Sequence, residues 1–190
     1  MKYVIVLVST LILGLAPANS QDSLWFTRTG RIYFISRTDI IDIDANNYQV
    51  GSFLNMKTGE VAFTLLMKSF EFTLPLAEEH FNENYVESEK YPKATFKGKI
   101  NSFNPSLLVG DADYPVEAQG DLTIHGVTAR VQEKGILRKT DEEIRLKAHI
   151  EIRLDTYKIK VPNIVADRVA LVIPIEVDML YKPYGKGAGK

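Results

Sequence analysis

The sequence predicts an all-β protein, built as a single antiparallel barrel of about eight strands with one short helix. Apolar and polar residues alternate along most of the chain, as in strands with one buried face and one hydrated face. Only one stretch, between residues 76 and 85, has helical spacing instead. An open sheet of this length would leave two unpaired edges and an uncovered apolar face, and closure into a barrel removes both.

Length, charge and cysteine content narrow the class of protein. The 190 residues suffice for one domain with its own core, and the chain has no cysteine, so no disulfide supports that core. The 23 basic and 24 acidic residues nearly cancel. A nucleic-acid-binding protein normally carries a basic excess, so this class is set aside.

The first twenty residues have the pattern of a secretory signal peptide. Lys2 precedes an apolar run from Tyr3 to Leu15, and small residues follow from Ala16 to Ser20. The run is too short to span a bilayer comfortably, and the small residues suit cleavage after Ala18 or Ser20. We therefore predict a signal peptide over 1–20, an exported protein that is periplasmic or secreted, and no stable membrane span. A membrane-anchoring helix is the alternative.

The mature domain is predicted to cover residues 21–180 and to begin with two strands. Leu24–Ser36 forms one long strand, bent or bulged near Gly30, and Asp39–Ala45 forms the next. Asn46-Asn47 and Gly51 are turn formers and predict a break after the second strand.

A hairpin and the helix follow. Val50–Leu54 and Glu60–Phe72 flank the turn sequence Lys57-Thr58-Gly59. Pro75 ends the sheet pattern, and the next residues have the spacing of a short helix that places three apolar side chains on one side, Leu76, Phe81 and Tyr85.

The rest of the chain again alternates with a period of two. The predicted strands are Ala94–Ile100, Val116–Ile124, Val127–Leu137, Ile144–Leu154 and Val169–Met179. Gly126 provides a tight connection between two of them. Residues 181–190 are rich in glycine and lysine and are predicted to be a flexible tail.

Two segments resemble the YceI-like family of exported lipocalin-like barrels. They are the run HFNENYVESEKYPKATFKGKI, from His80 to Ile100, and GDLTIHGVTARV, from Gly120 to Val131. The resemblance extends loosely from Trp25 to Met179. It implies an eight-stranded antiparallel barrel with a helix near its mouth and an apolar bore that takes a long isoprenoid chain, as in a polyisoprenoid or quinone.

One segment departs from the family pattern. Many members carry an Arg-x-Asp-aromatic-Gly sequence near the final hairpin. This chain has Arg153-Leu154-Asp155-Thr156-Tyr157-Lys158, with Thr156 inserted and no glycine.

The inward faces of the strands and the helix supply the candidate lipid-binding residues. They are large and apolar: Phe34, Phe63, Leu65, Phe81, Phe96, Leu122, Ile124, Ile150, Ile152, Leu171 and Ile173. Small residues at Gly98, Ala118, Gly120 and Ala148 are expected to leave space beside them. Burial of one isoprene unit would return roughly 3 kcal/mol before ordering costs. For any single residue, ordinary core packing is the alternative.

Polar candidates are few. Tyr91, Thr123 and His125 are candidates for rim groups that contact a ligand, although His125 could instead bond a neighbouring loop. His80, His125 and His149 have no carboxylate or cysteine at metal-ligand spacing. No G-x-S-x-G motif or other nucleophile arrangement is present, so we predict no metal, no cofactor and no catalysis.

The sequence thus predicts an exported binding protein for an isoprenoid-type lipid, a polyprenol or a quinone tail, with transport or storage as its use. The expected partner is that lipid or quinone, not nucleic acid, and a homodimer is an assembly that the sequence leaves open. The alternative is a non-catalytic cell-envelope interaction module whose barrel is filled by its own side chains.

Overall fold

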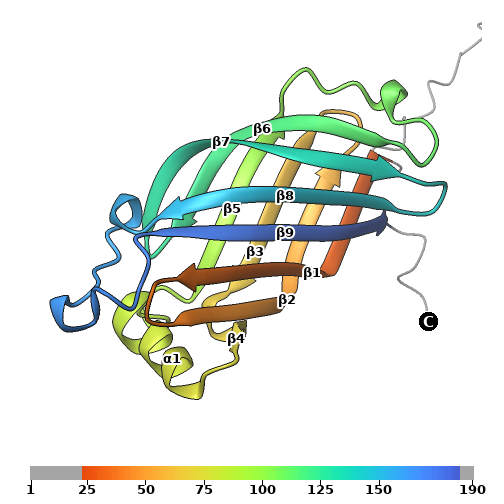
Figure 1. Cartoon of the computed structure of the whole chain (residues 1–190). Helices are drawn as coiled ribbons and strands as arrows, with labels where there is room; N and C mark the ends of the chain where they lie inside the picture. Colours follow the sequence, from red (N-terminus) through yellow and green to blue (C-terminus); the bar gives the residue numbers. More distant parts are fainter. Residues whose placement is uncertain (1–22, 185–190) are drawn as a thin grey trace, which may run out of the picture.

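The structure is a computed structural model and describes residues 23–184. Strands make up most of the regular secondary structure in this part of the chain (Figure 1). The strands are β1 (Leu24–Arg37), β2 (Asp42–Asn55), β3 (Glu60–Leu66), β4 (Glu71–Phe72), β5 (Lys93–Ile100), β6 (Asp113–Ile124), β7 (Val127–Lys139), β8 (Ile144–Arg153) and β9 (Val172–Pro183). The predicted signal peptide lies outside the described residues.

Eight of these strands close into the predicted antiparallel barrel. Their order is β1-β9-β8-β7-β6-β5-β3-β2, and the pairing of β1 with β2 completes the circle. The two-residue strand β4 adds only to the edge of β2. Closure gives each of the eight strands a paired neighbour on both sides, although β7 and β8 pair over only part of their length.

The predicted irregularity in the first strand is confirmed at Gly30. The register of β1 against β2 shifts on both sides of this residue. A Cβ atom at position 30 would lie 2.1 Å from the Met179 sulfur, so any other residue there would have to displace the Met179 side chain.

The predicted turn at Asn46-Asn47 is wrong, because both residues lie inside β2. Asn47 is fully buried, donates from Nδ2 to the Leu66 carbonyl oxygen and accepts from the Gln49 N–H. Its amide therefore makes its hydrogen bonds within the sheet and leaves the strand unbroken. The actual turn between β1 and β2 is closed by the Thr38 hydroxyl, which bonds backbone groups of Ile41.

The next hairpin forms at Lys57-Thr58-Gly59, as predicted, with Gly59 at a φ of 75°. Its second arm is shorter than the predicted Glu60–Phe72. After Leu66 the chain makes a turn at Met67–Ser69, whose first residue points into the core.

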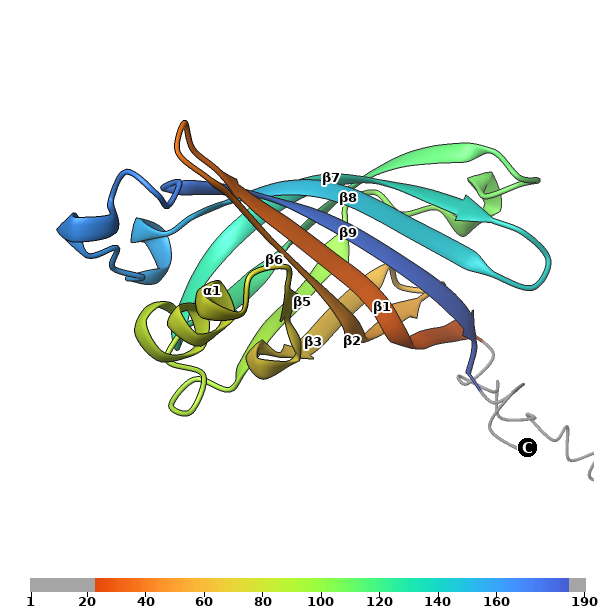
Figure 2. The ribbon, with the colours of Figure 1, turned by 60° about the horizontal axis from the view of Figure 1, so that its bottom comes forward.

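The helix α1 (Pro75–His80) starts with proline at its first turn and continues through a π-helical turn at Phe81–Tyr85. Backbone N–H groups in the first turn of a helix have no acceptor within the helix, so proline, which lacks an N–H, fits there without loss of a hydrogen bond. Both Figure 1 and Figure 2 place α1 at the same end of the barrel as the tip of the β1–β2 hairpin and the segment 154–171 that joins β8 to β9. We call this end the mouth.

The opposite end of the barrel is filled. Its fully buried side chains come from four strands and include Val50, Leu54, Leu137, Met179 and Tyr181. β9 continues through Tyr181 to Pro183, so the predicted tail begins too early. The Tyr181 hydroxyl makes a 2.7 Å hydrogen bond with Ser52 Oγ, which fixes this residue in the core. Residues 185–190 lie outside the described part of the chain.

Candidate functional site

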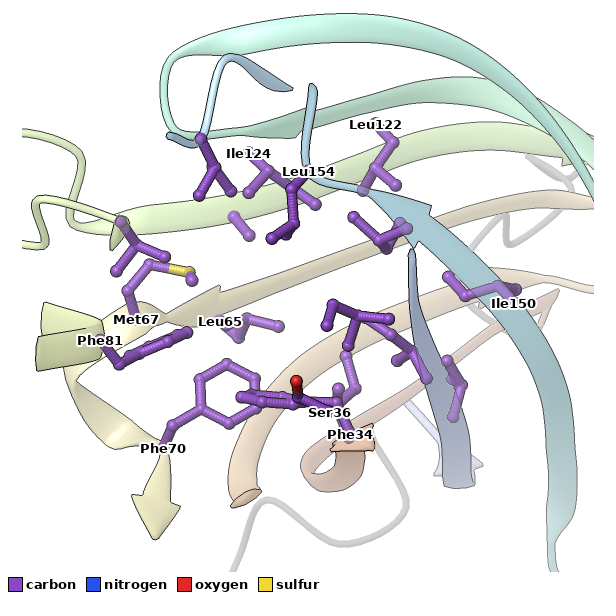
Figure 3. A pocket seen from close by; sticks show the side chains of 18 of the residues that line it. Phe34, Ser36, Leu65, Met67, Phe70, Phe81, Leu122, Ile124, Ile150 and Leu154 are labelled. Atoms are coloured by element: carbon purple, nitrogen blue, oxygen red, sulfur yellow. The ribbon is translucent and has the colours of Figure 1, made fainter. Parts of the chain in front are cut away.

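The barrel encloses a cavity of about 520 Å³ between the filled end and the mouth. This volume lies within the range of roughly 300–1,000 Å³ that is common for small-molecule sites. Its wall is almost wholly apolar, and Figure 3 shows carbon-rich side chains pointing into it from opposite sides of the barrel. The predicted alternative of a barrel filled by its own side chains is therefore wrong.

The alternation of the strands explains how the wall forms. In β8, Ala148, Ile150 and Ile152 line the cavity, while His149 and Glu151 between them face outward and are exposed. The antiparallel register then sets Ile150 beside Ile175 of β9 and repeats the pattern around the barrel.

Ten of the eleven predicted lipid-binding residues line this cavity. They are Phe34, Phe63, Leu65, Phe81, Phe96, Leu122, Ile124, Ile150, Ile152 and Ile173. Leu171 does not line it, contrary to the prediction, and its side chain is 66% exposed. The predicted strand began at Val169, but β9 begins only at Val172. The alternation of inward and outward side chains therefore does not include Leu171.

The predicted gaps divide into two kinds. Ala118 and Ala148 line the cavity and leave space beside them. Gly98 and Gly120 do not, because a Cβ atom at either residue would lie within 2.6 Å of the Phe96 ring carbon Cζ. These glycines make room for the Phe96 ring rather than for a ligand.

An aromatic cluster forms one side of the wall near the mouth. Phe34, Phe70, Phe72 and Phe81 come from β1, the turn after β3, β4 and the π-helical turn, and their ring centroids lie 5.0–5.7 Å apart. Figure 3 shows the rings of Phe34, Phe70 and Phe81 together. Sequence reasoning missed Phe70 and Phe72, although their period-two spacing at the end of an apolar strand was a usable signal.

The three predicted rim residues do not line the cavity. His125 is held by two acceptors: its Nδ1 lies 3.1 Å from the Tyr157 carbonyl oxygen, and its Nε2 lies 2.7 Å from a Glu87 carboxylate oxygen. Only the doubly protonated imidazole donates to both at once. Tyr91 packs edge-on against His125 at 4.5 Å, and Thr123 Oγ1 lies 2.7 Å from Thr128 Oγ1.

His125 therefore makes the loop contact that was the alternative to a ligand contact. It joins the β6–β7 turn to two segments of the mouth. The hydrogen bond from His125, with a smaller effect of Lys90, lowers the pKa of Glu87 below its usual value.

A few polar side chains do reach the cavity wall. Ser36 does so near the aromatic cluster, where its Oγ accepts the Ala170 N–H. His80 and Arg168 lie at the mouth, and Glu133 lies in the wall on β7. Sequence reasoning missed all four. Glu133 had a signal, since it occupies an inward position of the alternation from Val127 to Leu137.

Residues 23–184 contain no cluster of three His, Cys, Asp or Glu side chains that could hold a metal ion. Within the same residues, no helix has the length and apolar character needed to cross a membrane. His149 is exposed on the outer face of β8.

Solved structures with the same fold include three bacterial proteins. A polyisoprenoid-binding domain from Saccharophagus degradans, implicated in plant cell wall breakdown, has a TM-score of 0.72 at 14% identity, covering 85% of this chain and 98% of that domain. BcnA from Burkholderia cenocepacia has a TM-score of 0.67 at 14% identity, covering 80% and 95%. The YceI protein of Campylobacter jejuni has a TM-score of 0.53 at 14% identity, covering 95% and 96%.

No curated protein sequence matches the chain. The YceI-like domain, however, matches residues 29–177, which include every strand of the barrel in whole or in part. The chain therefore belongs to the YceI-like family.

Proposed function

We propose that this protein binds the hydrocarbon tail of an isoprenoid-type lipid, a polyprenol or a quinone, in the barrel cavity. The observation that carries the proposal is an open, almost wholly apolar cavity of about 520 Å³ in a barrel whose other end is filled. A cavity of this character gains most from a long apolar ligand, at about 0.8 kcal/mol for each buried methylene group. The name of the Saccharophagus degradans domain, which has the same fold, supports the same class of ligand.

Two features favour a branched, unsaturated tail over a straight one. The aromatic cluster of Phe34, Phe70, Phe72 and Phe81 presents ring faces and edges, which pack well against methyl branches and double bonds. On the opposite side, Leu122, Ile124 and Leu154 supply branched aliphatic groups (Figure 3).

The wider role in this proposal is transport or storage of the lipid outside the cytoplasm, without catalysis. The pattern of residues 1–20 supports export to the periplasm or beyond. Absence of catalysis fits a wall with few polar groups, of which Ser36 already accepts a backbone hydrogen bond. Whether the working form is a monomer or a homodimer is tested by light scattering with and without lipid.

The test is a binding titration with prenols of increasing chain length. Affinity is expected to rise with each isoprene unit until the cavity is filled and then to level off. The variant Ala118→Phe places a ring in the cavity and is expected to reduce affinity for the long prenols by tenfold or more, since burying several methylene groups is worth at least about 1.4 kcal/mol.

The matched control is Thr64→Phe, which adds the same ring on the exposed outer face of β3 and should bind as the wild type does. Absence of binding to any prenol, or equal loss in both variants, would contradict the proposal.

A further inference from the structure

One carboxylate interrupts the apolar wall. Glu133 lies on β7 in the inward register, between Val131 and Gly135, and its backbone pairs with that of Ala118. All of these residues line the cavity. Among the described residues of the wall, Glu133 is the one with an acidic side chain.

Glu133 lies where two neighbouring strands separate. β7 and β8 pair over only five residue pairs, from Lys139↔Ile144 to Gly135↔Ala148. Beyond Gly135, β7 runs on to Val127 and β8 to Arg153 without pairing to each other. The short helical turn Asp155–Tyr157 packs against both strands there.

The cavity reaches this separation. Glu133 and Gly135 of β7 line the cavity beside the point where the pairing with β8 ends. We call the separation of β7 from β8 beyond Gly135 the side slot.

Within residues 23–184, the Glu133 carboxylate forms no hydrogen bond or ion pair. Burial, and to a smaller extent the charge of Glu151, raises its pKa above the usual value. Lys134 alternates with it and is exposed on the outer side of the strand. A partly buried carboxylate without a partner leaves its acceptor oxygens available to a bound molecule.

We propose that Glu133 is the recognition site for the polar end of the ligand, and that this end is a hydrogen-bond donor, a hydroxyl or an ammonium, rather than a phosphate. The inference rests on the proposed function, because the tail is taken to fill the apolar cavity. The slot lets the polar end remain in contact with water while the carboxylate accepts its hydrogen bond. A phosphate at the same place would face a like charge and lose affinity.

The test compares three ligands with one tail, geranylgeraniol, geranylgeranylamine and geranylgeranyl phosphate, and the hydrocarbon phytane, which has the same carbon skeleton without double bonds and without a polar end. At neutral pH the wild type is expected to bind the amine and the alcohol more tightly than the phosphate. Glu133→Gln should weaken binding of the amine by about tenfold, the effect of losing one charged hydrogen-bond partner, and should strengthen binding of the phosphate. Phytane should bind equally to both proteins.

The control variant is Glu142→Gln, in the exposed turn between β7 and β8, which should leave all four affinities unchanged. If phytane and the alcohol bind but Glu133→Gln changes no preference among the polar ends, the role of Glu133 is contradicted and the proposed function stands. If none of the four ligands binds the wild type, the proposed function itself is contradicted.

Discussion

Several single residues hold the mouth in shape through unusual backbone conformations. Glu87, His125 and Lys158 have positive φ values of 45°, 52° and 56°, which residues other than glycine adopt at a cost. Contacts offset that cost for Glu87 and His125, which bond each other. The Lys158 side chain forms no hydrogen bond or ion pair within residues 23–184. At this position, after the aromatic residue, the pattern Arg-x-Asp-aromatic-Gly has glycine.

Lys158→Gly is therefore expected to stabilise the protein. The left-handed conformation costs a residue with a Cβ atom about 1 kcal/mol, and glycine adopts it freely. The free energy of unfolding, measured in urea, should rise by up to about 1 kcal/mol. Lys160→Gly is the control, since Lys160 has no positive φ, and it should lower stability. A decrease in both variants would contradict the interpretation.

His125 is expected to act on stability through its pairing with Glu87. His125→Asn, which tolerates the left-handed backbone, removes the bonds to Tyr157 and Glu87 and should lower the free energy of unfolding by about 1–3 kcal/mol. A double-mutant cycle with Glu87→Gln should give a coupling energy of at least about 0.5 kcal/mol. Additive effects would show that the two residues act separately.

The elements divide the barrel into a filled end and an open end. At the filled end β9 carries Met179 and Tyr181 into the core and pairs with both β1 and β8. At the open end, α1 and the segment 154–171 are connections between strands and do not pair across the opening. Stability is thus expected to come mainly from the filled end, which leaves the mouth free to admit a ligand.

Because Tyr181 is buried at the filled end, the folded protein is expected to lose stability at alkaline pH. Burial raises the pKa of Tyr181 far above its usual value, so the folded protein keeps this hydroxyl neutral when the unfolded chain ionises it. The stabilisation is complete below about pH 10, the pKa of tyrosine in an unfolded chain, and is lost as the pH rises above it. Urea unfolding between about pH 8 and 11 measures this change.

Tyr181→Phe should flatten that profile and cost about 1 kcal/mol at neutral pH, since the bond to Ser52 is lost. Tyr48→Phe, at a ring that is 48% exposed, should keep the wild-type profile. Identical pH profiles for wild type and Tyr181→Phe would contradict a buried, neutral hydroxyl.

For the whole molecule, local alternation was enough to predict the closed barrel and most of the wall. Ile150 and Ile152 could be placed because polar residues separate them in a regular strand. The prediction for Leu171 is wrong because β9 begins only one residue after it. The prediction for Asn47 is wrong because its side chain donates a buried hydrogen bond to the carbonyl oxygen of Leu66, far along the chain. Such contacts join residues far apart in sequence and leave no local pattern.

The side slot and the Glu133 carboxylate also could be predicted only in part from local sequence patterns. That Glu133 faces inward follows from the alternation, but the separation of β7 from β8 depends on how the whole barrel closes. The roles of Gly98 and Gly120 likewise depend on the Phe96 ring that covers both. Volume inside a barrel is thus a property of the assembled molecule.

The most direct test of the account is to identify the lipid that the protein retains. The full chain, with residues 1–20 intact during expression, is purified without detergent, extracted with organic solvent and analysed by mass spectrometry, with Ala118→Phe treated in parallel. The account predicts an isoprenoid lipid in near-stoichiometric amount with the wild type and much less with the variant. Wild-type protein that retains no isoprenoid lipid and takes up no added polyprenol would contradict it.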